Sequence, residues 1–273
     1  MRRVTRRARL RAGKYLAVAR VALATGLTYR GDYLFRASFL VVVMFVFMVL
    51  WRTTYDVTGE TVIDGFTLRD MIWYLAITET IIASRPRLAG RIDTEVKSGS
   101  LAYTLGRPYN YVLFQFAQSA GDIAARAVVN FTVAGGMAAL LVGPPPFGLC
   151  ELGAFVPVLL LALTLDFFLT MPVGLLAFWV EETGPFSFLQ DRLLMLLGGM
   201  MLPLEVFPPL LRRIAGWLPM SLIVYAPART LAGERLPFPG QVIAAQVSWL
   251  AVGIVVCTLV FRAGVKKVNL HGG

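Results

Sequence analysis

The sequence is poor in the residues that carry most enzyme chemistry. Its 273 residues include one histidine, His271, and two cysteines, Cys150 and Cys257, too few for a zinc or similar His/Cys metal centre. It contains neither an HExxH segment nor a GxSxG segment. The only Gly-Lys pair, Gly13-Lys14, lacks the preceding glycine of a phosphate-binding P-loop. We therefore expect this chain to hold no catalytic site, no metal and no cofactor.

Charged residues are also scarce, at 15% against roughly 25% in an average soluble domain. Hydrophobic residues make up 57% of the chain, and several apolar runs approach the ~20 residues that a bilayer crossing requires. The net charge is +10, but the basic residues flank the apolar runs and form no stripe on a polar domain. The composition indicates a protein of the lipid bilayer and argues against nucleic acid as a partner.

The N-terminal segment is strongly basic. Residues 1–36 contain ten Lys and Arg and a single acid, Asp32, and the next fifteen residues, 37–51, carry no charge. Because positive segments are retained in the cytoplasm, we expect residues 1–33 to lie on that side. Apolar residues recur at helical spacing from Arg9 to Tyr29, which predicts a helix in the inner membrane interface. A basic tail that only orients the chain is the alternative.

Six apolar segments predict an all-α integral membrane protein in which residues 1–273 form a single transmembrane domain. Spans occupy 34–261 and are followed by a basic tail, 262–273. The expected spans cover about 34–51, 68–86, 109–142, 152–180, 190–207 and 241–261.

The charge distribution sets the expected orientation. An even number of spans places both termini on one side. With the termini inside, the inner segments hold nineteen of the 26 Lys and Arg and the outer segments hold six, which favours cytoplasmic termini. Cys150 and Cys257 then lie near opposite faces of the bilayer, too far apart for a disulfide.

The segment 203–240 is too apolar for an ordinary loop and too rich in proline for a full crossing. Among its prolines are Pro203, Pro208, Pro219 and Pro227. We expect short re-entrant helices in the outer leaflet, because broken backbone inside a bilayer has to be covered by protein. A cap of amphipathic turns on the outer surface is the alternative.

Charged residues within expected spans are functional candidates, and four of them stand well inside the apolar runs. Asp122 and Arg126 are four residues apart, so we expect them to pair on one helix face and to hold their span against a neighbour. Asp166 either lines a polar pathway or bonds to a neighbouring span. Glu79 stands alone where span 68–86 faces protein.

The inner loop 85–110 carries apolar residues at helical spacing among charged ones and has a helix stop at Gly99. This pattern predicts a short amphipathic helix on the cytoplasmic face. Such a helix can dock into a groove of another protein. A solvated connector is the alternative.

Three stretches of the chain resemble the small six-span permease subunits of bacterial ABC-type exporters, an ABC-2-like family. One is SGSLAYTLGRPYNY, through Gly99, Leu101, Leu105, Arg107 and Pro108. Another is GGMMLPLEVFPPLLRRIAGWLPM followed by YAPARTLAG, and the third is KYLAVARVALATGLTYRGDYLFR near the N-terminus. The likeness covers nearly the whole chain, although Gly106 stands where a larger residue is expected.

The resemblance implies a type V exporter fold with an interfacial N-terminal helix, six spans, a coupling helix over about 88–104 and outer re-entrant helices. It implies a bacterial plasma membrane location, two separate subunits that bind ATP and Mg, and a second permease chain, identical or paralogous. Coupling would involve Arg91, Ile92, Glu95, Val96, Gly99, Leu101, Leu105, Arg107 and Pro108.

The implied function is export of an amphipathic or hydrophobic substrate by a permease without a nucleotide site of its own. Charge reversal at Arg91 or Glu95 would then uncouple ATP hydrolysis from transport. An ion-coupled secondary transporter and a non-transporting membrane scaffold are the alternatives.

Overall fold

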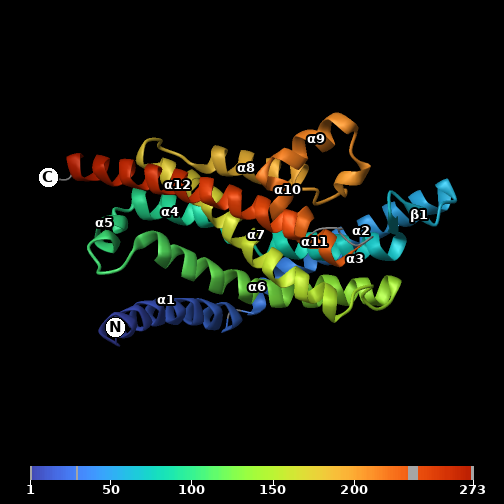
Figure 1. Cartoon of the computed structure of the whole chain (residues 1–273), viewed down its shortest axis with the longest axis horizontal. Helices are drawn as coiled ribbons and strands as arrows, with labels where there is room; N and C mark the ends of the chain where they lie inside the picture. Colours follow the sequence, from blue (N-terminus) through green and yellow to red (C-terminus); the bar gives the residue numbers. More distant parts are fainter. Residues whose placement is uncertain (1, 29, 233–238, 272–273) are drawn as a thin grey trace.

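The computed structural model describes residues 2–28, 30–232 and 239–271 and consists largely of helices. In Figure 1 the long helices lie side by side along the longest axis, and the two ends of the chain lie toward the same end of the molecule. The expected all-α fold is confirmed, with one small hairpin of strands β1 (Val62–Ile63) and β2 (Phe66–Thr67) in the described part.

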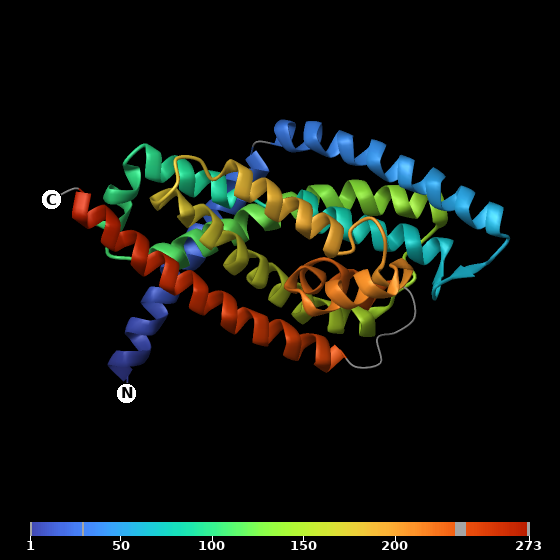
Figure 2. The same ribbon diagram turned by 90° about the horizontal axis from the view of Figure 1, so that it is seen from above.

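Helix α1 (Arg2–Thr28) runs obliquely across the long axis and packs on α6 (Tyr111–Val142), as Figure 2 shows. The two backbones approach closely at Gly121, where a Cβ would clash with the carbonyl oxygen of Ala19. The backbone N–H of Asn110 donates to the Tyr15 hydroxyl at 3.1 Å. The expected N-terminal helix is therefore present, and its depth in the membrane interface stays a prediction.

Helix α3 (Leu68–Ala83) follows α2 (Arg30–Thr58) and the hairpin, and it is enclosed by protein. Thr67 and Asp70 form a reciprocal capping box that starts the helix. Every side chain from Met71 to Ile81 is buried, against α2, α6 and α11 (Tyr225–Leu231). The sequence 71–77 is apolar on all sides, as expected of a helix without a solvent face.

Four helices of the described part are long and apolar enough to cross a bilayer. They are Ser38–Thr58 within α2, Tyr111–Val142 in α6, Leu149–Phe178 in α7 (Leu149–Leu175) with η1 (Leu176–Phe178), and Gly240–Lys267 within α12 (Pro239–His271). They coincide with four of the six expected spans.

The other two expected spans correspond to shorter helices. Helix α3 has 16 residues and α8 (Gly184–Leu197) has 14. At 1.5 Å per residue they measure about 24 Å and 21 Å, below the ~30 Å of a hydrocarbon core. The expected bounds 190–207 are wrong, because α8 ends before Gly198 and Gly199, and Gly199 has a φ of +71°. The count of six spans stays a prediction.

The segment after α8 forms short helices: η2 (Leu204–Val206), α9 (Pro209–Trp217), α10 (Pro219–Ile223) and α11. Its prolines mark the helix starts: Pro203 precedes η2, Pro208 precedes α9, Pro219 begins α10 and Pro227 lies in the first turn of α11. Helices α10 and α11 pack against α7, so their broken backbone is covered by protein. Their depth in a membrane stays a prediction, and residues 233–238 lie outside the described part.

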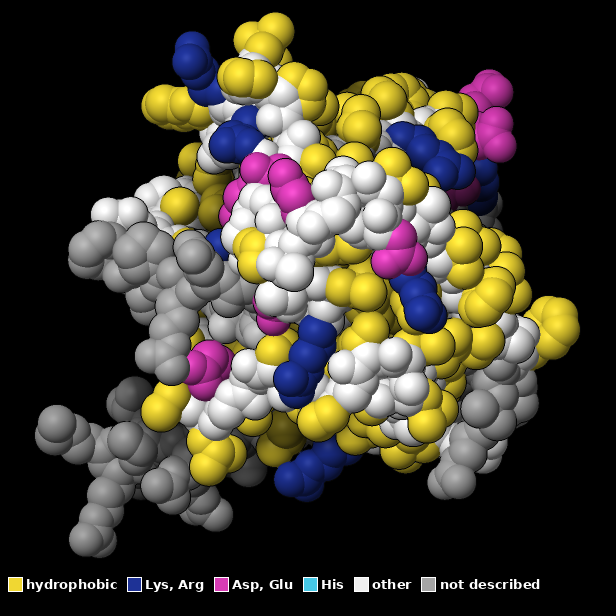
Figure 3. All heavy atoms as spheres, turned by 90° about the vertical axis from the view of Figure 1, so that its right-hand side faces the viewer, with side chains coloured by type: hydrophobic (Ala, Val, Ile, Leu, Met, Phe, Trp, Pro, Cys, Tyr) yellow, Lys and Arg dark blue, Asp and Glu magenta, His cyan; other side chains and the backbone are white. Residues whose placement is uncertain are grey.

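The end of the molecule that carries the hairpin and α9 is the end we expect outside. Figure 3 views this end and shows both basic and acidic side chains among hydrophobic ones. Asp56, Glu60 and Asp64 are exposed in the first connection there. Both cysteines are free, with Cys150 exposed and Cys257 buried.

Candidate functional site

Helices α4 (Leu88–Lys97) and α5 (Ser100–Leu105) connect α3 to α6 at the end where the chain termini lie (Figure 1). The single element expected over 88–104 is thus two helices. Gly99, with a φ of +71°, turns the chain between them. Lys97 Nζ lies 2.7 Å from Asp93 Oδ2, a pairing of i and i+4 on α4.

One side of α4 is buried against α7. Leu88, Ala89 and Ile92 are buried there. Gly174 of α7 faces them, and a Cβ on it would lie 2.8 Å from Ile92 Cδ1 and 2.9 Å from Ala89 Cα. Real Cβ atoms do not come so close, so the absence of a side chain at Gly174 is what allows the two helices to pack at this distance.

A second side of α4 is hydrogen-bonded to α6 through Glu95. The Tyr111 hydroxyl donates to Glu95 Oε2 at 2.6 Å. Gln115 Nε2 lies 3.1 Å from both carboxylate oxygens and donates to them. These bonds place the charged carboxylate between two neutral donors of one helix face, where it is partly buried.

Arg91 continues the same contact one turn earlier. Its Nη1 donates to Asp122 Oδ2 at 3.0 Å, and its Nη2 donates to Ser119 Oγ at 3.0 Å. We call the whole set the α4–α6 ladder, which consists of Arg91, Glu95, Tyr111, Gln115, Ser119 and Asp122. It fixes the rotation of α4 about its own axis.

The ladder shows which side of α4 faces α6. Arg91 and Glu95 were expected to take part in coupling, and in the structure both side chains are bonded to α6. Their role in coupling stays a prediction. Of the other expected coupling residues, Ile92 and Leu101 are buried, and Val96 and Leu105 are half-buried. Gly99, Arg107 and Pro108 are exposed. We define the docking face as the exposed residues Arg87, Gly90, Thr94, Lys97, Tyr103 and Arg107.

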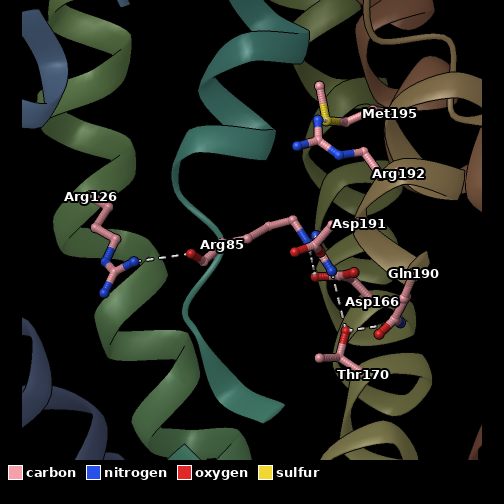
Figure 4. A network of polar contacts seen from close by, with 8 residues as sticks. All are labelled: Arg85, Arg126, Asp166, Thr170, Gln190, Asp191, Arg192 and Met195. Atoms are coloured by element: carbon pink, nitrogen blue, oxygen red, sulfur yellow. Dashed lines mark hydrogen bonds and ion pairs between the residues drawn. The ribbon is translucent and has the colours of Figure 1, made fainter. Parts of the chain in front are cut away.

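Arg85 lies between α3 and α4 and joins both to α7 and α8, as Figure 4 shows. Its Nε donates to Asp166 Oδ2 at 2.9 Å and its Nη1 to Asp191 Oδ1 at 2.6 Å. Its Nη2 donates to Thr170 Oγ1 at 3.3 Å, and Gln190 Nε2 donates to the same oxygen at 3.3 Å. We call Arg85 with these four partners the Arg85 junction.

Of the two roles considered for Asp166, the junction shows the bond to a neighbouring segment, which its buried carboxylate accepts from Arg85. A polar pathway at Asp166 stays a prediction. Helix α6 supports the same segment. Arg126 Nη1 donates to the Arg85 carbonyl oxygen at 3.0 Å, and Asn130 Nδ2 donates to Ser84 Oγ at 3.0 Å. Arg126 was expected to pair with Asp122 on α6. Both residues instead link α6 to other segments, Asp122 to α4 and Arg126 to the end of α3.

Glu79, the fourth charged residue expected in a span, is buried on α3. The described residues offer no hydrogen-bond partner to its Oε1. They also contain no group of three His, Cys, Asp or Glu side chains placed to hold a metal ion.

At its middle, α3 holds the segment that follows α8. The Tyr74 hydroxyl donates to the Gly199 carbonyl, and Thr78 Oγ1 donates to the Met200 carbonyl at 3.0 Å. Because α3 also continues into Ser84 and Arg85, it connects the α4 region with the middle of α8 and with the segment that follows α8.

The opposite end of the molecule has its own ion pair. Arg229 Nε lies 2.9 Å from Glu205 Oε1, and the Tyr225 hydroxyl donates to the same oxygen at 2.7 Å. The Arg229 guanidinium lies 4.8 Å from the centre of the Phe66 ring. These contacts tie α11 to η2 and to the hairpin.

A cleft of about 580 Å³ lies between α4 and α8 beside the docking face. Its charged lining includes Arg87, Asp93, Glu182 and Asp191, so both signs are present. Arg85, Thr170 and Gln190 of the Arg85 junction also line the cleft.

Arg85, Tyr111 and Gln115 were not among the expected functional residues. The sequence does contain a pattern that could have identified Tyr111 and Gln115. Polar residues recur every three or four positions on this membrane helix and form one stripe, which consists of Tyr111, Gln115, Ser119 and Asp122. Asp122 is the only member of this stripe that its charge marks as a functional candidate.

One family of known proteins matches most of the chain. Residues 40–272 match the family model described as ABC-2 family transporter protein. A search of curated proteins finds no match. The match extends from α2 through α12 and includes α4, α5 and the Arg85 junction. The chain therefore belongs to the ABC-2 family of transporter proteins, as a multi-pass membrane permease subunit.

Proposed function

We propose that this chain forms half of the pathway of an ATP-driven exporter in the bacterial plasma membrane. Two separate subunits that bind ATP and Mg act on two permease chains, identical or paralogous, whose termini lie in the cytoplasm. Exposed apolar side chains on α2 and α8, among them Phe39, Phe45 and Leu189, suit an amphipathic or hydrophobic substrate. The direction of transport follows from the resemblance in sequence.

The observation that carries the proposal is the three-sided environment of α4. One side is buried on α7, a second is bonded to α6, and the third is free and polar. A permease without a nucleotide site responds to ATP only through a contact that differs between the two states of its partner. The free side, with Arg87, Gly90 and Thr94, is placed to make that contact.

The bonds of α4 then pass the motion of the partner to the transmembrane helices. The α4–α6 ladder links a displacement of α4 to α6, and the Arg85 junction links it to α7 and α8. Closely packed and hydrogen-bonded elements shift as units between discrete arrangements, which is how a small movement at a docking site reaches a distant pathway.

A steric test uses two glycines. Gly90 is exposed on the docking face, and a Cβ there meets nothing within 4 Å. Gly90→Leu therefore adds bulk to this face without an internal clash. Gly216 on α9 is equally open but lies at the opposite end of the molecule, so Gly216→Leu is the matched control.

The measurement is the ATP hydrolysis that co-purifies with the tagged chain from its native membranes. We expect Gly90→Leu to weaken the association about tenfold or more, equivalent to about 1.4 kcal/mol or more. Gly216→Leu should retain the activity of the unsubstituted chain. Equal retention by the two variants would exclude this face as the docking site.

A further inference from the structure

A cavity of about 260 Å³ lies between α3, α6 and α7, apart from the docking face and the Arg85 junction. Helix α6 contributes Ile123, Ala127 and Phe131 to its lining, and α7 contributes residues from Leu152 to Leu163. That stretch of α7 is twelve residues long, or about 18 Å at 1.5 Å per residue. The cavity is thus an elongated groove that follows the gap between two candidate membrane spans.

The groove is unsuited to water or a polar solute. Its lining is apolar except for Thr80 and Ser84. The Thr80 hydroxyl already donates to the Ala76 carbonyl oxygen at 2.6 Å, and Ser84 Oγ already accepts from Asn130 at 3.0 Å. A buried water needs two to four polar partners, whereas an apolar cavity of only ~150 Å³ stays dry and takes up benzene.

The groove opens sideways, toward the medium around α6 and α7. Two of its lining side chains are part of the molecular surface, since Phe131 is 43% exposed and Leu152 is 37% exposed. Around candidate membrane spans, that medium at mid-helix depth is the hydrocarbon of the bilayer. The shape, the chemistry and the opening therefore all suit one extended hydrocarbon chain.

We propose that this groove binds an acyl chain of a bilayer phospholipid. The chain fills the space between α3 and the α6–α7 pair, where it supplies the van der Waals contacts that an empty groove lacks. The end of the groove near Phe147 and Leu152 lies toward the connection of α6 and α7. The head group of the bound phospholipid therefore belongs to the leaflet on that side. This inference does not depend on the identity of the exported substrate.

A filling variant tests the proposal. Ala127→Trp places a large ring inside the groove. Ala139→Trp places the same ring on the exposed surface of α6 outside it, as the control. Both proteins are reconstituted in phosphatidylethanolamine–phosphatidylglycerol vesicles and extracted into detergent. Native mass spectrometry then measures the fraction of each protein that carries a bound phospholipid. We expect the phospholipid adduct to fall at least tenfold for Ala127→Trp and to persist for Ala139→Trp. Persistence of the adduct in both variants overturns the proposal.

A second measurement uses the unsubstituted chain and keeps the test valid if a variant misfolds. The same vesicles carry a phospholipid with a diazirine in its acyl chain, and the labelled residues are mapped after illumination. Labelling should concentrate on Ala127, Phe131 and Leu159 in the groove. Leu140 and Leu160 are 88% and 59% exposed and lie outside it. Labelling that instead follows exposure, and so favours Leu140 and Leu160, overturns the proposal.

Discussion

Arg85 Nε lies 2.9 Å from Asp166 Oδ2, and both side chains are largely buried, with 12% and 8% of their surfaces exposed. The two residues are 81 positions apart in sequence, and their contact joins the connection between α3 and α4 to the middle of α7. Because a buried charge is costly without its partner, this pair fixes how α4 is placed relative to the transmembrane helices.

Replacing Arg85 by methionine should destabilise the protein strongly. The substitution leaves the Asp166 carboxylate buried without its cation, a loss of about 3–5 kcal/mol in comparable cases. Arg192→Met is the control, because that guanidinium is exposed and its Nη1 contacts Met195 Sδ at 3.5 Å. Thermal unfolding in detergent compares the two variants. The double variant Arg85→Met/Asp166→Leu should recover much of the loss, and a double variant as unstable as the single one would contradict this account.

Replacing Glu95 by alanine should loosen α4 from α6. The variant loses the hydrogen bonds from Tyr111 and Gln115 to a charged acceptor, which are worth about 1.5–3 kcal/mol each in stability. Hydrogen exchange of the α4 backbone amides should therefore accelerate. The neighbouring exposed Thr94→Ala should leave it nearly unchanged. Unchanged exchange in Glu95→Ala would show that the α4–α6 ladder does not hold the helix.

Gly174→Ala should push α4 away from α7. The new methyl group would lie 2.8 Å from Ile92 Cδ1 and 2.9 Å from Ala89 Cα, so we expect a loss of about 1–3 kcal/mol from overpacking. Gly153→Ala, on the same helix with nothing within 4 Å of the new Cβ, is the control. Thermal unfolding again measures the difference. Ile92→Val should rescue Gly174→Ala only in part, because the contact with the Ala89 backbone remains.

The two native cysteines offer a test of orientation. Cys150 is exposed at the start of α7, on the end expected outside, and Cys257 is buried. A membrane-impermeant maleimide added to intact cells should therefore label the unsubstituted chain, and Cys150→Ser should abolish the label. In that background, Thr94→Cys on the docking face should react only after permeabilisation. Labelling of Thr94→Cys in intact cells would invert the proposed topology.

The long membrane helices could be predicted closely from the sequence. A bilayer span requires about 20 apolar residues, so an uninterrupted apolar run of that length predicts the position of a membrane helix. Span 109–142 coincides almost residue for residue with α6, Tyr111–Val142. The predicted bounds 190–207 were wrong because apolar residues continue past Gly198 and Gly199, although the chain turns there.

The short amphipathic helix between the second and third expected spans was also predictable, but the neighbour that each of its faces contacts was not. Charged and apolar residues alternate on α4 so that more than one face is polar. Which polar face meets α6 depends on Tyr111 and Gln115, which lie 16 and 20 positions beyond Glu95. Helical periodicity shows that residues share a face, and it does not show which neighbour that face contacts.

The amino-acid sequence by itself determined that this protein lies in a lipid bilayer, where its long helices run and where the amphipathic helix α4 lies between α3 and α6, because hydropathy and charge act along the chain within a few residues of each other. Only the tertiary structure decided that Arg91 and Glu95 turn toward α6 and that Arg85 joins the α3–α4 connection to α7 and α8. Those outcomes depend on contacts between segments that are far apart in sequence. A buried charged group is costly unless it is paired, so each of these side chains adopts the orientation that brings it to its partners.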